Sequence, residues 1–141
     1  LLTWVVNTKN INELIKRAAF SLGKAELINR GELDWCFGLP EDGRLLAGGM
    51  LPYAIEWQTD VHPSLNMENL GCNLHSLEIH HPYSEWLKYA LASVGALNLV
   101  KINALPKNAT PYLVAQISTP FGIRALSSYV GFNKGLQQTG C

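Results

Sequence analysis

The chain has 141 residues, of which 48% are hydrophobic and 16% are charged, a composition typical of one compact domain. Its 11 basic residues balance 11 acidic ones without a local basic run, so we expect no nucleic-acid partner. No apolar run approaches the roughly 20 residues of a membrane helix, so we expect no membrane segment. Its three cysteines, without a CxxC spacing, argue against a disulfide scaffold or zinc knuckle and favour a cytoplasmic location.

The first half of the chain begins with a β-prone run over residues 2–8, and an amphipathic helix follows it. The helix has an apolar stripe of residues spaced three and four apart: Ile11, Leu14, Ile15, Ala18, Ala19 and Leu22. Asn10 and Glu13 form a capping pair at its start, and Gly23 is expected to end it in a left-handed conformation.

Strand signals dominate the residues after this helix. Residues 32–39 alternate between polar and apolar side chains, which predicts a strand with Trp35 on its apolar face. A turn at residues 40–43 and a loosely structured stretch lead to a second predicted strand over residues 53–57. Residues 60–71 are rich in polar residues and are expected to link the two halves of the chain.

The second half repeats this order of elements. A β-prone run over residues 74–80 precedes a helix whose apolar stripe consists of Trp86, Leu87, Ala90, Leu91 and Val94. Ser84 or His81 is the expected N-cap, and Gly95 is expected to end the helix. Strands are then predicted over residues 99–105, 112–118 and 123–128.

The two halves align with each other at an offset of 72 residues. The aligned pairs are Glu13 with Glu85, Lys16 with Lys88, Ala18 with Ala90, Ser21 with Ser93, and Gly23 with Gly95. The sequence therefore predicts an α+β fold made of two strand-helix-strands units. Each helix covers only one face of its sheet, so we expect the two sheets to curl toward each other around a shared cavity.

The repeat, together with four short motifs, resembles the glyoxalase-like branch of the vicinal oxygen chelate superfamily from residue 1 to about 128. The motifs lie at residues 1–8, 51–57, 62–63 and 119–122. The resemblance implies one domain over residues 1–141, built of two βαβββ modules whose strands form an incomplete mixed β-barrel with the helices packed outside. Module one would span about residues 1–59, the linker 60–71, module two 72–130, and a polar tail 131–141.

Metal-using relatives take divalent-metal ligands from the first and last strands of their modules. The resemblance places the corresponding positions at Thr3, Glu56, Leu74 and Leu126. Only Glu56 could bind a metal, and one carboxylate cannot hold a catalytic cation, so we expect no cofactor. His75 would face the cavity as a second ligand if the offset of 72 held through the strand, whereas an offset of 71 turns it toward the helix.

Seven residues are expected to line the cavity and bind a ligand: Thr3, Asn7, Trp35, Glu56, Ser76, Glu78 and Leu126. Glu56 is also the candidate catalytic residue, because a carboxylate buried in the cavity would act as a general base or bind a cation. The alternative for Glu56 is a structural carboxylate that is solvated or paired with an arginine.

Three functional hypotheses follow from the sequence. The leading hypothesis is a small-molecule-binding protein without a metal, which holds an apolar or mildly cationic ligand between its modules. The second is an enzyme of the lyase, isomerase or dioxygenase type that uses Glu56, with or without His75, as metal ligand or general base. The third is a structural or interaction domain, complete or a fragment of a longer protein, whose exposed sheet edges pair with a second copy to form a homodimer.

Overall fold

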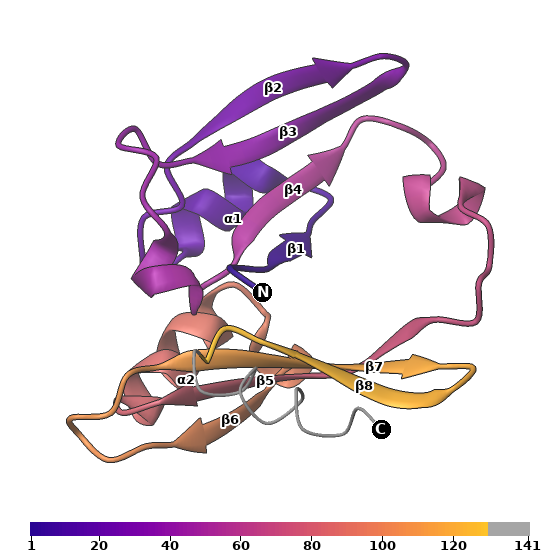
Figure 1. Ribbon diagram of the computed structural model, residues 1–141. Helices are drawn as coiled ribbons and strands as arrows, with labels where there is room; N and C mark the ends of the chain where they lie inside the picture. The colour runs from indigo at the N-terminus through magenta and orange to yellow at the C-terminus, as the bar shows by residue number, and fades with distance from the viewer. Residues whose placement is uncertain (130–141) are drawn as a thin grey trace.

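The computed structural model describes residues 1–129, which form two mixed four-stranded sheets and two α-helices (Figure 1). The first unit consists of β1 (Val5–Asn7), α1 (Ile11–Arg17), β2 (Lys24–Arg30), β3 (Leu33–Leu39) and β4 (Tyr53–Trp57). The second unit consists of β5 (Asn73–His81), α2 (Ser84–Ser93), β6 (Lys101–Ala104), β7 (Tyr112–Thr119) and β8 (Gly122–Ser127). The predicted α+β class with two β-rich modules is confirmed, and no closed barrel forms within residues 1–129. The predicted tail, 131–141, lies outside the described residues.

The order of elements along the chain repeats as predicted, but the strands pair differently in the two units. The first sheet has the order β1-β4-β3-β2, so its first strand lies at the edge, parallel to its last strand. The second sheet has the order β6-β5-β7-β8, so β5 lies inside the sheet, between parallel β6 and antiparallel β7.

The position of the tight hairpin accounts for this difference, because strands joined by a two-residue turn must lie side by side. In the first unit the hairpin joins β2 and β3 through residues 31–32, where Gly31 has a φ of 64°. In the second unit it joins β7 and β8 through residues 120–121. The long connection therefore precedes β4 in the first unit and β7 in the second. It allows β4 to lie between β1 and β3, and β7 to lie on the side of β5 opposite β6.

Helix α1 is shorter than its apolar stripe predicts. The predicted cap is confirmed, since the side chain of Asn10 accepts a hydrogen bond from the backbone amide of Glu13. The helix ends at Arg17, however, and Ala18 already has an extended conformation. Gly23 has the expected positive φ of 79°, but it lies just before β2, where a side chain would collide with the carbonyl group of Leu39.

Helix α2 ends where the sequence predicts. Gly95 has a φ of 72°; its amide donates to the Ala92 carbonyl, and the amide of Ala96 donates to that of Leu91, which together form a Schellman motif. The N-cap is Tyr83 rather than Ser84 or His81. The second unit also repeats the ion pair of the first, with 2.9 Å between Lys16 and Glu13 and 2.7 Å between Lys88 and Glu85.

One hydrophobic core joins the two units. It contains buried side chains from α1 and β4 of the first unit and from β5, α2 and β7 of the second, among them Ile11, Leu14, Ala54, Ile79, Leu91 and Leu113. The Ser93 hydroxyl on α2 accepts a hydrogen bond from the amide of Ala19 at 2.9 Å, which ties the end of the first helix to the second. Within residues 1–129, neither helix has the length and apolar character needed to cross a membrane.

Candidate functional site

One hollow of the described chain lies where the two units meet. It has a volume of about 560 Å³ and is lined by Ala47 from the first unit and by His81, Tyr83 and Trp86 from the second. Its wall is mostly apolar, and Trp86 and Tyr83 remain about half exposed beside it. Hollows of this size, with aromatic walls and few polar groups, are typical of small-molecule sites.

His81 and the hydroxyl-bearing Tyr83 are the polar residues of this hollow. The side chain of His81 is buried, its ring lies 5.7 Å from the Trp86 ring, and its Nδ1 atom accepts a hydrogen bond from the amide of Tyr83 at 2.9 Å. Burial lowers the pKa of His81, because the charged imidazolium is poorly solvated there. An accepting Nδ1 fixes the neutral tautomer with its proton on Nε2, and no residue among 1–129 accepts that proton. His81 therefore offers one N–H donor to a ligand.

The loop that supplies Ala47 has an unusual backbone. Ala47 has a φ of 47°, a left-handed conformation that costs roughly 1–2 kcal/mol for a residue with a Cβ atom. Gly48 and Gly49 follow with positive φ, and a side chain on Gly49 would collide with the carbonyl group of Leu2. The buried neighbours Leu46, Met50 and Leu51 hold this turn in the core, so the Ala47 methyl group has a fixed place at the hollow.

A second hollow, of about 350 Å³, adjoins the first. Ala47 and Trp86 line both, and the second is completed by Phe20, Ser21, Leu46, Leu51 and Arg44. Trp86 and Ala47 thus line both hollows, and we call the two hollows together the groove; His81 lines the first and Arg44 lines the second. Arg44 is the only cation among the described residues that line the groove.

The predicted site residues of the first unit lie elsewhere. Asn7 and Glu56 come together at a separate hollow of about 300 Å³ at the ends of β1 and β4. The Oε2 atom of Glu56 accepts a hydrogen bond from the amide of Ile11 at 2.7 Å, so this carboxylate caps α1. Trp35 packs against Trp57 with ring centroids 5.4 Å apart, and the buried Thr3 hydroxyl has no hydrogen-bond partner among residues 1–129.

The predicted residues of the second unit form no single site with them. Ser76 and Glu78 alternate with buried Leu77 on β5, on the face turned away from the core. Leu126 is an exposed residue of β8. His75 is exposed at the irregularity between Leu74 and Ser76, where β5 and β7 lose register.

The positions that the superfamily resemblance assigns to metal ligands do not fit a metal. Leu74 and Leu126 have no donor atoms, and Glu56 already binds the amide of Ile11. Within residues 1–129, no three His, Cys, Asp or Glu side chains come close enough together to hold a metal ion.

Comparison with known families identifies the fold of the first unit and of the start of the second. The model of the glyoxalase-like domain family matches residues 1–95. The chain belongs to this family. No curated protein and no solved structure matches the chain. The matched region of this glyoxalase-like domain contains every residue of the groove from His81 to Arg44.

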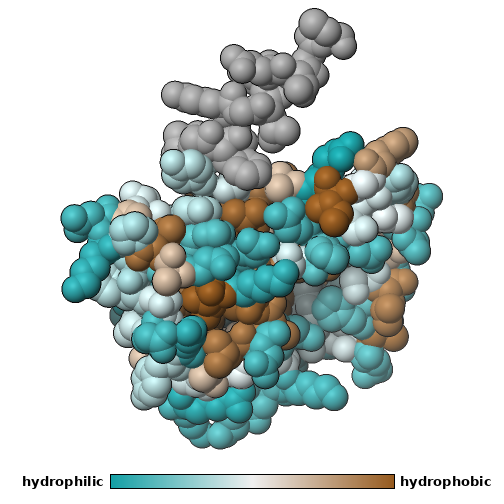
Figure 2. All heavy atoms as spheres, turned by 90° about the horizontal axis from the view of Figure 1, so that it is seen from below, coloured by the Kyte–Doolittle hydropathy of each residue, from teal (hydrophilic) through white to brown (hydrophobic). Residues whose placement is uncertain are grey.

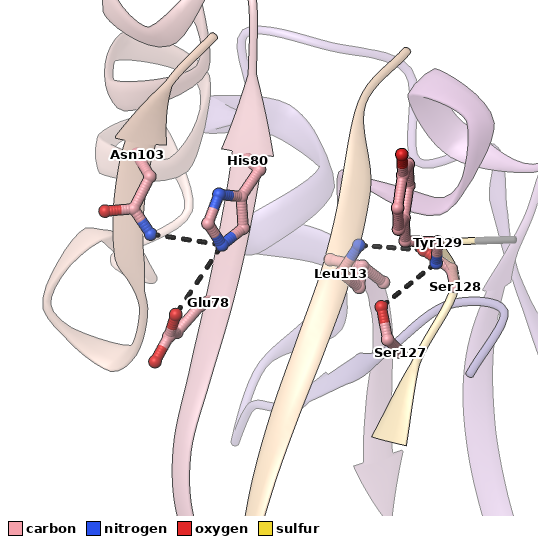
Figure 3. A network of polar contacts seen from close by, with 7 residues as sticks. All are labelled: Glu78, His80, Asn103, Leu113, Ser127, Ser128 and Tyr129. Atoms are coloured by element: carbon pink, nitrogen blue, oxygen red, sulfur yellow. Dashed lines mark hydrogen bonds and ion pairs between the residues drawn. The ribbon is translucent and has the colours of Figure 1, made fainter. Parts of the chain in front are cut away.

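The glyoxalase-like domain also carries a polar cluster on the second sheet (Figure 3). The Nε2 atom of His80 lies 3.5 Å from the carboxylate of Glu78 and 3.3 Å from the amide nitrogen of Asn103. The imidazole stacks on the Tyr112 ring at 4.3 Å, and Tyr129 packs beside Tyr112 at 5.0 Å. In one tautomer of the imidazole Nε2 can accept a hydrogen bond from the Asn103 amide, and in the other it can donate one to Glu78.

Exposed apolar side chains also occur away from the groove, and three of them, Leu65, Met67 and Leu70, line another hollow of about 570 Å³ together with polar residues of the segment that links the two units. The exposed apolar side chains are spread over several elements: Leu27, Val61, Leu65, Met67, Leu70, Leu74, Phe121, Ile123 and Leu126 are all more than half exposed. Figure 2 shows one face on which such side chains form several patches separated by hydrophilic residues. Scattered exposure of this kind is normal for protein surfaces, whereas a hollow with aromatic walls is not.

The sequence did not predict the residues of the hollow between the two units. His81 was considered only as a helix cap, and Trp86 only as part of the apolar stripe of a helix. The available signal was the cluster of His81, Tyr83 and Trp86 around Pro82, where a strand ends and a helix begins. Contact with Ala47 depends on how the two units pack, which no local pattern encodes.

Proposed function

We propose that this glyoxalase-like domain binds a small, mainly apolar molecule in the hollow between its two units, without a metal ion. The supporting observation is the hollow of about 560 Å³ with aromatic walls and the Nε2–H group of a neutral, buried His81. An apolar ring or chain packs against Trp86 and Ala47, and an acceptor atom of the ligand binds the His81 proton.

The contribution of Trp86 can be estimated from its exposure. The side chain is 47% exposed without a ligand. A ligand that covers on the order of 50 Å² of this side chain gains about 1.2 kcal/mol of binding free energy at ~25 cal/mol per Å². This free energy corresponds to a roughly eightfold change in affinity.

A fluorescence titration with N-phenyl-1-naphthylamine, an uncharged aromatic probe, tests the proposal. We expect one binding site per chain, and we expect Trp86→Ala to weaken binding about eightfold. Tyr89→Ala is the matched control, because Tyr89 is an exposed aromatic residue of the same helix, α2, outside the lining of the hollow. The proposal fails if Trp86→Ala leaves the affinity unchanged, or if Tyr89→Ala weakens binding equally.

A further inference from the structure

We propose that the ligand is an amphipathic anion, whose apolar body lies across Trp86 and whose carboxylate or other oxyanion binds Arg44. This inference rests on the proposed function and specifies the class of ligand. It concerns the second hollow, beyond Trp86, and the charge at its end.

The continuity of the two hollows supports an elongated ligand. The first hollow, beside His81, and the second, beside Phe20, Leu46 and Leu51, share Ala47 and Trp86 in their walls. Their volumes of about 560 and 350 Å³ exceed what a single ring fills. A molecule with an apolar body of eight to ten carbons, an order-of-magnitude estimate from these volumes, would contact both.

The backbone of Arg44 is fixed at the end of this groove. Its carbonyl group accepts a hydrogen bond from the Tyr53 hydroxyl at 2.8 Å, and its amide donates to Oδ1 of Asp42 at 3.2 Å. The guanidinium lies 3.5 Å from the other Asp42 oxygen, and 62% of the side chain is exposed. Since a guanidinium has five N–H donors in a planar fork, Arg44 can bind an oxyanion while it remains near Asp42.

The charges around the groove favour an anion over a cation. Arg44 and the Nε2–H group of His81 are donors at opposite ends. Among residues 1–129, no Asp or Glu side chain lines either hollow, although Glu41 and Asp42 line an adjoining hollow that shares Ser21 and Arg44 with the second one. The Asp42 carboxylate is paired with Arg44, so an anion has to compete with it, whereas an ammonium group would be repelled by the guanidinium. The mildly cationic ligand considered from the sequence would have needed Glu56, whose carboxylate binds the amide of Ile11 instead.

Three probes of equal length separate the alternatives: decanoate, 1-decanol and decylamine. Each is used below its micelle concentration, at a pH near 7, to displace N-phenyl-1-naphthylamine from the protein. Because Arg44 is largely exposed, its ion pair with a ligand is screened, and we expect decanoate to bind about two- to fivefold more tightly than 1-decanol. Decylamine should bind most weakly, and the advantage of decanoate should shrink as salt is added.

Two substitutions with opposite effects locate the anion. Arg44→Gln should abolish the advantage of decanoate and leave the affinity for 1-decanol unchanged. Asp42→Asn should increase the advantage, because it removes a carboxylate that competes for Arg44 and keeps the side-chain oxygen that accepts from the Arg44 amide. Arg30→Gln is the control, since Arg30 is an exposed arginine at the opposite end of β2 from the groove.

Each outcome decides between the two proposals. Equal affinity for decanoate and 1-decanol, tighter binding of decylamine, or an unchanged decanoate preference in Arg44→Gln would overturn the anion proposal. In those cases, 1-decanol binding that still depends on Trp86 would leave the proposed hollow intact. Binding of none of the probes at Trp86 would overturn the proposed function itself.

Discussion

Replacing Glu56 with alanine is expected to destabilise the fold, because its carboxylate is the hydrogen-bond partner of the first amide of α1. Oε2 of Glu56 lies 2.7 Å from the backbone nitrogen of Ile11, a residue that is 1% exposed. Asn10 already accepts from the amide of Glu13, so it cannot replace the missing carboxylate without giving up that bond.

The magnitude follows from what each substitution leaves behind. Glu56→Ala leaves a buried N–H donor without an acceptor and removes a negative charge from a helix N-terminus, which together cost about 2–3 kcal/mol. Glu56→Gln keeps an acceptor oxygen and loses only the charge, which costs about 0.3–1 kcal/mol. The two variants should therefore differ by more than 1 kcal/mol, roughly the value of one satisfied buried donor.

Urea unfolding followed by circular dichroism measures both effects as changes in the free energy of unfolding. Glu26→Ala and Glu26→Gln serve as controls, because Glu26 is an exposed carboxylate of β2 in the same unit. A free energy of unfolding for Glu56→Ala within about 0.5 kcal/mol of the wild type would refute the capping role. Equal destabilisation by Ala and Gln would also refute it, since the negative charge, rather than the acceptor, would then be what matters.

Two further predictions concern the contacts between the units. Burial holds the pKa of His81 below its ordinary value of 6.5, so the unfolded chain binds this proton first as the pH falls. The urea midpoint of unfolding should therefore not depend on the protonation of His81 above pH 6.5 and should fall progressively below that pH. The variant His81→Gln should flatten this decline, and His75→Gln, which replaces an exposed histidine, is the control. An equal decline in the two variants would contradict the assignment to His81. Ser93→Ala removes the hydrogen-bond acceptor of the Ala19 amide and should speed hydrogen exchange at Ala19. The free energy of unfolding should fall by only about 0.5 kcal/mol, because Ala19 is exposed. Unchanged exchange at Ala19 would show that this bond does not join the units.

The elements that the sequence predicted are those with a local signal. The strand at Tyr53–Trp57 and the end of α2 at Gly95 were predicted correctly, because alternation and a left-handed glycine act within a few residues. The end of α1 was predicted wrongly, because Leu22 continues the helical spacing but is buried after the helix has ended. Tertiary packing, rather than helical period, explains that apolar residue.

The register of the second unit's first strand shows how far the internal repeat extends. Val6 and Leu77, which are 71 residues apart, are both buried in their strands, whereas the helices align at 72. The additional residue therefore lies after Leu77, between that position and α2, whereas the irregularity between Leu74 and Ser76 precedes Leu77. The sequence could suggest two registers but could not choose between them, because an irregular strand changes which face each later residue occupies.

The candidate site was hardest to predict, because it depends on contact between units. Ala47 and Trp86 are far apart in the sequence and carry no motif, and only the shared core brings them to the same hollow. Glu56, by contrast, was predicted as a site residue because it is a carboxylate between two apolar strand residues. A carboxylate that caps a helix has the same sequence pattern.

A crystal structure of the protein with bound N-phenyl-1-naphthylamine would locate the ligand site most directly. We predict that the probe lies between Ala47 and Trp86, with the face of an aromatic ring toward the Nε2–H group of His81. Probe density against Trp35 and Trp57 on the first sheet, with the hollow between the units left empty, would contradict the proposed site.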